Sequence, residues 1–433
     1  MSIMRVLMLC TKYPVEAKDS YMTSELAGAL VTAGNRVQVV VTDWNAPYGA
    51  PSSTVQKDGV DIFVVAPRSV RWLGSFVEKM TKWVFSSVFA WAQMRRLLRN
   101  QSFDILICFT PCVTVAAQLA WATKRFRTCN ILFVLDFFPY HHHSIGLLPG
   151  GLVFAVARRL EEHLVRKFDM IGCMSGMNVE YLCSHYRLQH EQQVEVTPIW
   201  GLVTPPPPID RASMRKKYGL PLNKKIAVFG GQMTQGRGVE EILSAAAMLK
   251  DKRPDLFFLL IGEGRLEHLV EGCISSGAHN VIFHRRIPRT DYLGLISACD
   301  LGLVCTVTGV DVPTFPYKTI DYLRANLPIV AAVEDTTDYG RFVREHGLGA
   351  ALPAGDPAAL ANVIEQVIDD PGGAAAAARS CLDQIFDVRR TVARIENAFL
   401  GLAEHPTSVR HGLRPRQYDS GVVGCRRTRN TRG

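Results

Sequence analysis

The stretch Asp311-Val-Pro-Thr-Phe-Pro-Tyr-Lys-Thr-Ile-Asp-Tyr-Leu-Arg-Ala-Asn-Leu-Pro-Ile-Val-Ala-Ala-Val333 predicts a loop, a short helix and a buried strand in succession. Pro316 suits the first turn of a helix, because its backbone angle is already helical and its missing N–H is not needed there. Asn326-Leu327-Pro328 ends the helix, since asparagine tolerates the left-handed cap and proline cannot continue a helix. The apolar run from Ile329 to Val333 then reads as the next buried strand.

Within the predicted helix, Lys318, Asp321 and Tyr322 fall at i, i+3 and i+4 and share one face, with Ile320 on the opposite, core side. The first turn of a helix attracts anions, because its N–H groups have no partner within the helix. Lys318 could hold a phosphate, and the Asp321 carboxylate could accept two neighbouring sugar hydroxyls. Together they would suit a nucleoside diphosphate. The alternative is an ordinary surface helix with an ion pair between Lys318 and Asp321.

Composition predicts a globular protein of two or three domains. The chain has 433 residues, of which 48% are hydrophobic and 21% charged. No apolar run reaches the ~18 residues that span a bilayer. The N-terminus lacks a signal-peptide cleavage site, and the eleven cysteines show no paired spacing, which is typical of reduced thiols in a cytoplasmic protein. The net charge of +9 favours polyanionic partners, and on charge alone both anionic lipid and nucleic acid are possible.

Two series of alternating strands and helices predict two parallel-sheet domains. In the first series, an apolar run at 4–10, a helical pattern at 23–34 and a strand at 37–42 make a βαβ unit. The proline run at 205–208 stiffens a linker, so we place the domain boundary there. Residues 406–433 carry seven arginines and little apolar content, and this composition predicts a disordered basic tail.

The second domain opens with a strand that leads into a glycine-rich turn, Lys225-Ile-Ala-Val-Phe-Gly-Gly-Gln-Met-Thr-Gln-Gly-Arg-Gly238. Glycines such as Gly231 and Gly238 let the backbone approach phosphates, and the following helix points its dipole at them. Arg237 adds a cation for a pyrophosphate. A nicotinamide dinucleotide site is the alternative, but the glycine spacing does not match GxGxxG.

In the first domain, polar groups follow the strand predicted at 130–135. The chain continues Asp136-Phe-Phe-Pro-Tyr-His-His-His143, and side chains at the carboxyl end of such a strand are placed to meet a ligand. Asp136 is our first candidate for a base or orienting group toward an acceptor, with His141, His142 and His143 next. The alternative for Asp136 is a helix or turn cap. Three consecutive histidines cannot all face one ion in a regular element, so we expect no metal site.

The segment 71–100 interleaves aromatic and aliphatic residues with basic ones. It carries Trp72, Trp83 and Trp91 close to arginines and lysines, and tryptophans beside basic residues suit the headgroup boundary of a membrane. The alternative is an amphipathic helix that packs on its own sheet with its basic residues solvated.

The stretch 311–333 quoted above resembles a known signature. Pro316, Lys318, Asp321-Tyr322-Leu323, Ala325 and Leu327-Pro328 look like the nucleotide-sugar motif of family-four glycosyltransferases, which have the GT-B fold. The resemblance implies two Rossmann-like domains that face each other across a cleft, over 1–203 and 209–385, with a helix at about 386–402 returning to the first. It also implies that Asp321 binds the donor ribose.

Other positions match the family less closely. Gln232 takes the slot of an early arginine, and Arg237-Gly238 takes the slot of a Lys-Gly pair. Pro313 stands where the family often has a second acid, with Asp311 nearby. Gly262 and the segment 284–287, which includes Arg285, resemble the wall that binds the base of the donor.

The acceptor side also carries a resemblance. Asp136-x-x-Pro139 is similar to a branch of the family that acts on lipid-linked acceptors in bacterial polysaccharide assembly. We therefore expect sugar transfer, with retention of configuration, from a nucleoside-diphosphate sugar to a lipid-linked or other saccharide acceptor. The protein would work peripherally on the inner face of the cell membrane, without cofactor, metal or nucleic acid. A nucleotide-sugar epimerase and a non-catalytic nucleotide-sugar-binding partner are the alternatives.

Overall fold

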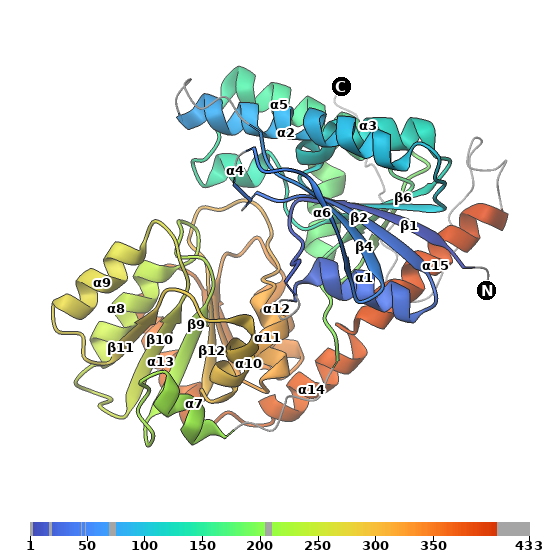
Figure 1. Ribbon diagram of the computed structural model, residues 1–433. Helices are drawn as coiled ribbons and strands as arrows, with labels where there is room; N and C mark the ends of the chain where they lie inside the picture. Colours follow the sequence, from blue (N-terminus) through green and yellow to red (C-terminus); the bar gives the residue numbers. More distant parts are fainter. Residues whose placement is uncertain are drawn as a thin grey trace, which may run out of the picture. The chain divides into compact units, whose positions relative to one another are not determined.

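The computed structural model describes residues 3–404 apart from five short gaps, at 17–19, 45, 48, 69–74 and 204–209 (Figure 1). The predicted proline linker, the basic tail and the start of the 71–100 segment lie outside the described residues. The chain divides into two compact units. Unit 1 is Met1–Pro198 together with Val388–Gly433, and unit 2 is Ile199–Asp387.

Unit 1 is built on an eight-stranded sheet with the order β3-β4-β2-β1-β5-β6-β7-β8. All neighbours are parallel except the edge pair β3 and β4. The strands are β1 Arg5–Cys10, β2 Arg36–Thr42, β3 Ser53–Lys57, β4 Val60–Val65, β5 Ile105–Phe109, β6 Cys129–Val134, β7 Met170–Cys173 and β8 Gln193–Val196. The strand order reverses between β1 and β5, and parallel sheets bind ligands beyond the carboxyl ends of their strands at such a point.

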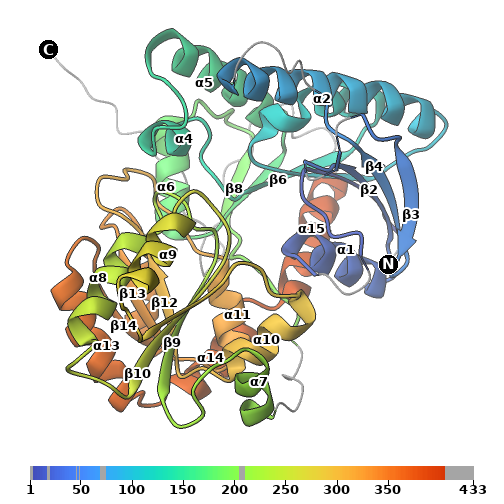
Figure 2. The same ribbon diagram turned by 60° about the vertical axis from the view of Figure 1, so that its left-hand side comes forward.

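Helices cover both faces of the unit 1 sheet (Figures 1 and 2). The views agree that α2, α3 and α5 lie over one face and that α1 and α15 pack together on the other. The helices are α1 Met22–Thr32, α2 Ser75–Leu98, the 3₁₀ turn η2 Cys112–Val115, α3 Ala116–Arg125, α4 Tyr140–Ser144, α5 Gly151–Val165, α6 Gly176–His185 and α15 Val388–Glu404. The last helix joins unit 1 although the chain reaches it only after completing unit 2.

Unit 2 is built on a six-stranded parallel sheet with the order β11-β10-β9-β12-β13-β14. The strands are β9 Lys225–Gly230, β10 Leu256–Ile261, β11 Val281–His284, β12 Leu301–Cys305, β13 Ile329–Val333 and β14 Gly349–Pro353. The helices are α7 Arg211–Lys217, α8 Val239–Leu249, α9 Glu267–Ser275, α10 Arg289–Ser297, α11 Lys318–Arg324, α12 Tyr339–Glu345, α13 Pro357–Asp369 and α14 Ala374–Gln384. Here the strand order reverses between β9 and β12.

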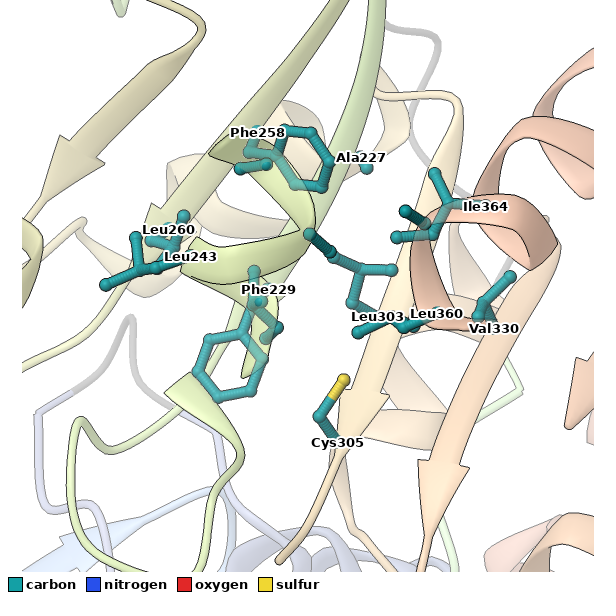
Figure 3. Close-up of a cluster of buried hydrophobic side chains, with 14 of the residues drawn as sticks. Ala227, Phe229, Leu243, Phe258, Leu260, Leu303, Cys305, Val330, Leu360 and Ile364 are labelled. Carbon is teal, nitrogen blue, oxygen red and sulfur yellow. The ribbon is translucent and has the colours of Figure 1, made fainter. Parts of the chain in front are cut away.

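The core of unit 2 fills the space between the central strands and the helices α8 and α13 (Figure 3). Phe229 and Phe258 of the sheet and Leu360 and Ile364 of α13 are fully buried. A buried side chain of this size stabilises the fold by about 1.5–3 kcal/mol relative to exposure. The core therefore holds the carboxyl ends of β9 and β12 in fixed positions.

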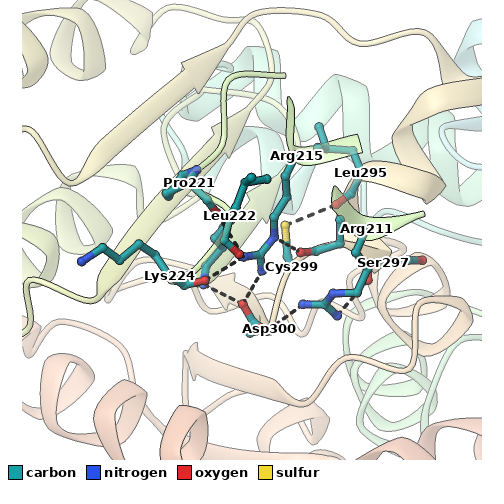
Figure 4. Close-up of polar contacts among 11 residues, drawn as sticks. Arg211, Arg215, Pro221, Leu222, Lys224, Leu295, Ser297, Cys299 and Asp300 are labelled. Atoms are coloured by element: carbon teal, nitrogen blue, oxygen red, sulfur yellow. Dashed lines mark hydrogen bonds and ion pairs between the residues drawn. The ribbon is translucent and has the colours of Figure 1, made fainter. Parts of the chain in front are cut away.

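A polar cluster fixes the amino end of β12 (Figure 4). Arg215 of α7 pairs with Asp300 at 2.9 Å, and Arg211 pairs with the other carboxylate oxygen at 2.8 Å. Asp300 also accepts the N–H of Ile226 in β9 at 2.9 Å. The remaining N–H groups of Arg215 donate to main-chain oxygens, those of Ala298, Pro221, Leu222 and Lys224. The cluster lies at the opposite end of the strand from the carboxyl edge where a ligand is expected.

The predicted fold class is confirmed, with two parallel α/β sheets, but two local expectations are wrong. The helix over 318–324 has no open face, because its residues from Thr319 to Arg324 are all buried. Tyr322, expected to share a ligand face, bonds through its hydroxyl to the main chain of Gly230, Val228 and Leu303. The histidines at 141–143 lie on the short helix α4.

Candidate functional site

The glycine-rich turn after β9 touches the end of β12 at the reversal point of the unit 2 sheet. Gly238 has a left-handed backbone (φ 60°), and a Cβ there would lie 2.5 Å from Cβ of Cys305 and 2.8 Å from the Thr306 carbonyl oxygen. Only glycine fits this approach. On the other side of the turn, a Cβ at Gly262 would lie 1.7 Å from the Gly231 carbonyl oxygen. The predicted glycines therefore form one continuous backbone surface beyond β9, β10 and β12.

Lys318 reaches this surface from the start of α11. Its Nζ lies 3.5 Å from the centre of the Phe229 ring, and a Cβ at Gly231 would lie 3.4 Å from the same nitrogen. Burial, and secondarily the positive charge of Arg237, lower the pKa of the Lys318 ammonium to about 7. Two basic side chains thus lie near the glycine-rich turn, and this combination can bind phosphates.

Asp321 is paired inside unit 2. Arg289, the first residue of α10, donates from Nη1 to Oδ2 at 2.8 Å and from Nη2 to Oδ1 at 2.6 Å. Arg324 lies 3.6 Å from Oδ1. The Asp321 side chain keeps 7% of its surface exposed. Its contact with a ribose stays a prediction. Sequence reasoning missed Arg289, because an arginine after proline gives no signal beyond an ordinary helix start.

Two other predicted donor residues have exposed side chains. Gln232 is exposed in the glycine-rich turn. The Arg285 guanidinium pairs with Glu267 at 3.1 Å and Glu271 at 2.6 Å, both on α9. The Arg285 side chain is thus engaged on the surface by α9. A contact with a donor base would come from the backbone near Arg285.

In unit 1, Asp136 follows β6 and faces His142 of α4. His142 Nδ1 lies 3.6 Å from the Asp136 carboxylate. The N–H of Asp136 donates to the Thr110 hydroxyl at 3.0 Å, which ties it to the neighbouring exit of β5. The His142 ring stands edge-to-face against Trp83 and Phe138. The structure thus places an imidazole beside the Asp136 carboxylate at the carboxyl end of β6.

Glu161 supports this region from α5, and sequence reasoning missed it. Its carboxylate is fully buried and accepts the N–H groups of Cys112 at 2.7 Å and Val113 at 2.9 Å. Burial raises the pKa of Glu161 to about 7, which the two N–H bonds partly oppose, and the charge of Asp136 adds to the rise. An acid among helical leucines and valines gives little warning in sequence that it will be buried.

The outer surfaces of α2 and α5, which lie side by side in both views, carry exposed apolar side chains (Figures 1 and 2). On α5 these are Leu152, Val156 and Leu160, with 78%, 55% and 44% of their surface exposed. On α2 they are Phe85, Val88 and Leu97. Exposed arginines accompany them, namely Arg95, Arg96, Arg99 and Arg159. We call this set of ten residues the α2–α5 surface.

No three His, Cys, Asp or Glu side chains in the described ranges gather as ligands of a metal ion would. None of the helices in that part of the chain has the length and apolarity to cross a membrane.

Relatives and solved structures are similar over most of the chain. The "Probable glycosyltransferase WbjE" of Pseudomonas aeruginosa is 25% identical over 59% of this chain and 64% of its own length. A GDP-mannose-dependent monoacylated alpha-(1-6)-phosphatidylinositol monomannoside mannosyltransferase of Corynebacterium glutamicum is 23% identical over 53% of this chain and 60% of its own. The chain therefore spans less than two thirds of the length of these two relatives. Sucrose-phosphate synthase from Thermosynechococcus elongatus has the same fold, with a TM-score of 0.70, 15% identity and coverage of 92% and 99% of the two chains.

Family models account for both units. The model "Glycosyltransferase Family 4" matches residues 20–198, and the model "Glycosyl transferases group 1" matches residues 210–380. The first range falls within unit 1 and the second within unit 2. Together with the two parallel sheets and the likeness to solved structures, the matches confirm the resemblance that the motif around Asp321 carries. The chain belongs to the GT-B glycosyltransferases of group 1 and family 4.

Proposed function

We propose that this protein transfers a sugar, with retention of configuration, from a nucleoside-diphosphate sugar to a lipid-linked saccharide acceptor. The observation that carries the proposal is the convergence of Lys318, Arg237 and the glycine backbone at the reversal point of the unit 2 sheet. A pyrophosphate needs cations beside a backbone that it can approach closely, and the glycine-rich turn and these two basic residues meet that need in unit 2. The donor site would comprise Gly231, Gln232, Arg237, Gly238, Gly262, Arg285, Lys318 and Asp321.

On the donor side, catalysis would come from charge and position. The nucleoside diphosphate gains negative charge as the bond to the sugar breaks, and Lys318 and Arg237 would stabilise it. Their positions are set before the donor arrives, because the Phe229 ring and the fixed backbone at Gly238 hold the surrounding elements. Holding the reactants in line then supplies much of the remaining rate.

On the acceptor side, Asp136 would orient the attacking hydroxyl or accept its proton. His142, with Nδ1 3.6 Å away, would help to orient the Asp136 carboxylate. His141, on the same short helix, is a further candidate for contact with the acceptor. The hydrogen bond from the main chain of Asp136 to Thr110 supports this role, since it fixes the backbone from which the carboxylate projects.

A lipid acceptor would bring the protein to the inner face of the cell membrane as a peripheral protein. The α2–α5 surface supports this part of the proposal, because apolar side chains flanked by arginines suit a bilayer surface that carries anionic headgroups. The sequence predicted such a surface on α2, and the exposed residues of α5 enlarge it.

A transfer assay tests the proposed function. Wild-type protein is incubated with radiolabelled UDP-glucose, UDP-galactose, GDP-mannose and GDP-fucose, with and without a bacterial membrane lipid extract. We expect one donor to label an extractable lipid, and Asp136→Asn to reduce that transfer about a hundredfold while donor binding persists. Conversion of the donor to an epimer without labelling any lipid would contradict the proposal. Donor binding with neither labelled lipid nor hydrolysis would also contradict it and would favour a non-catalytic partner.

A further inference from the structure

The buried carboxylate of Glu334 joins two parts of one loop in unit 2. The loop runs from Thr306, directly after β12, to Tyr317, directly before α11. Glu334, directly after β13, accepts hydrogen bonds from the Thr306 hydroxyl and, at 2.9 Å, from the Thr314 hydroxyl. The main-chain N–H of Glu334 in turn donates to the Thr306 hydroxyl at 3.1 Å. Glu334 is 6% exposed, so these hydroxyls take the place of water around its carboxylate.

Two threonines that follow Glu334 also form hydrogen bonds with this loop. Thr336 donates from its hydroxyl to the Val310 carbonyl oxygen at 3.0 Å, and Thr337 donates to the Thr314 carbonyl oxygen at 2.6 Å. The segment 334–337 therefore holds the loop at its start, middle and end. A loop with this many side-chain bonds to a neighbouring segment keeps one conformation at less cost than a solvated loop.

The opposite side of this loop belongs to the proposed donor site. The Thr306 carbonyl packs against Gly238, where an added Cβ would lie 2.8 Å away. Thr314 is four residues before Lys318, whose ammonium lies over Phe229 beside Gly231. A displacement of either end of the loop would thus also shift the backbone that contacts Gly238 or the segment that leads into Lys318.

We propose that Glu334 is a positioning residue that preforms the 306–317 loop to receive the sugar moiety of the donor. This inference rests on the proposed function. Within the loop, the Pro313 side chain has no polar group, and Asp311 is exposed. Recognition of the sugar would therefore depend on the loop backbone and on Asp311, and the bonds of Glu334 to the loop would set their positions. The nucleotide moiety meets the glycine turn and Lys318 and depends on the loop less.

Three variants separate positioning from general stability. Glu334→Ala removes both hydroxyl contacts, whereas Glu334→Gln keeps an acceptor and a donor that the two threonine hydroxyls can use. Asp300→Asn is the matched control, because it weakens a polar cluster at the opposite end of β12 (Figure 4). Affinities are measured by calorimetry for UDP against UDP-glucose and for GDP against GDP-mannose.

We expect Glu334→Ala to weaken nucleotide-sugar binding about tenfold, the effect of losing one or two hydrogen bonds, with less than about threefold change for the free diphosphate. Glu334→Gln should stay within about threefold of wild type for both. Without any ligand, amide hydrogens of the loop should exchange faster in Glu334→Ala and stay protected in Asp300→Asn. Equal losses for nucleotide and nucleotide sugar, or unchanged exchange in the loop, would overturn the inference. Failure of wild type to bind any of the four compounds would instead contradict the proposed function on which it rests.

Discussion

Arg289 and Asp321 form a two-bonded ion pair inside unit 2, at 2.8 Å and 2.6 Å. Arg289 opens α10 and Asp321 lies in the first turn of α11, so the pair ties two neighbouring helices together. With 21% and 7% of their side chains exposed, both groups have lost most of their hydration. Asp321 therefore has a structural role in addition to the ribose contact proposed for it.

Replacing Arg289 should destabilise unit 2. Arg289→Met leaves Asp321 buried with Arg324 alone, at 3.6 Å, and breaking a buried pair costs about 3 kcal/mol. Urea denaturation followed by circular dichroism measures the loss. The double variant Arg289→Met with Asp321→Asn should recover part of it, because it leaves no unpaired carboxylate. Arg285→Met, whose ion pairs lie on the surface, is the control and should change the unfolding midpoint far less. Equal stability of Arg289→Met and wild type would show that the Arg289–Asp321 pair does not stabilise unit 2.

Donor affinity should depend on pH through Lys318. Its pKa of about 7 in the free protein means that the ammonium, the form that binds phosphate, is depleted above neutrality. Binding then requires proton uptake, so the dissociation constant of a nucleotide sugar should rise by up to about tenfold per pH unit between pH 7 and 9. Below pH 7 it should be flat, since the phosphates of a nucleotide sugar do not titrate there.

Lys318→Arg provides the matched control for this pH dependence. A guanidinium stays charged throughout the range, so the variant should bind with an affinity that does not change between pH 6 and 9. Calorimetry in buffers of different ionisation enthalpy would also count the protons taken up by wild type. A flat profile for wild type would contradict the assignment of Lys318 to the phosphates.

Stability should depend on pH through Glu161. Burial raises its pKa from 4.5 to about 7 in the folded protein, so between these values the folded state binds more protons than the unfolded state. The contribution of Glu161 is then fully present below pH 4.5 and is lost as pH rises through 7. Thermal unfolding of wild type and Glu161→Gln from pH 5 to 8 measures the difference. The stability gap between them should shift in favour of Glu161→Gln as pH rises, and a constant gap would contradict the prediction.

Membrane binding should depend on the exposed stripe of α5. Leu152→Glu with Val156→Glu removes two apolar side chains from the α2–α5 surface and adds negative charge. Each such side chain contributes about 1.5–3 kcal/mol when buried, so sedimentation with phosphatidylglycerol vesicles should fall at least about tenfold. Met248→Glu, at an exposed apolar position of unit 2, is the control and should sediment like wild type. Equal sedimentation of all three proteins would remove the α2–α5 surface from the proposal.

The charges of the same surface can be tested separately. Reversing Arg95, Arg96 and Arg99 to Glu should abolish the preference for phosphatidylglycerol over phosphatidylcholine vesicles. An unchanged preference would mean that other basic residues set it.

Part of the candidate donor site could be recognised in the sequence, because its signals are local. The glycine-rich turn that ends at Gly238 and the lysine at the start of a helix can be recognised from their immediate neighbours. The two-sheet fold followed from the alternation of apolar runs and helical patterns. Each of these features depends on residues a few positions apart.

Features that depend on distant contacts could not be predicted. The rule that a short helix has one polar face failed for α11, because its neighbours bury it on every side and the Tyr322 hydroxyl bonds to strands 94 and 19 residues away. The partners of Asp321 and Glu334 lie 32 and 20–28 residues away in the chain. An acid or an arginine carries no local sign of which distant group it will meet.

Thermal unfolding with nucleotide sugars tests the central claim, that unit 2 binds the donor at Lys318 and the glycine turn. A ligand at a hundredfold excess over its dissociation constant stabilises the native state by about 2.7 kcal/mol, which is visible as a higher melting temperature. We predict that one of UDP-glucose, UDP-galactose, GDP-mannose and GDP-fucose raises the melting temperature of wild type and of Arg285→Ala, but not of Lys318→Ala. An unchanged rise in Lys318→Ala would contradict the site, and a rise with NAD alone would contradict the nucleotide-sugar donor.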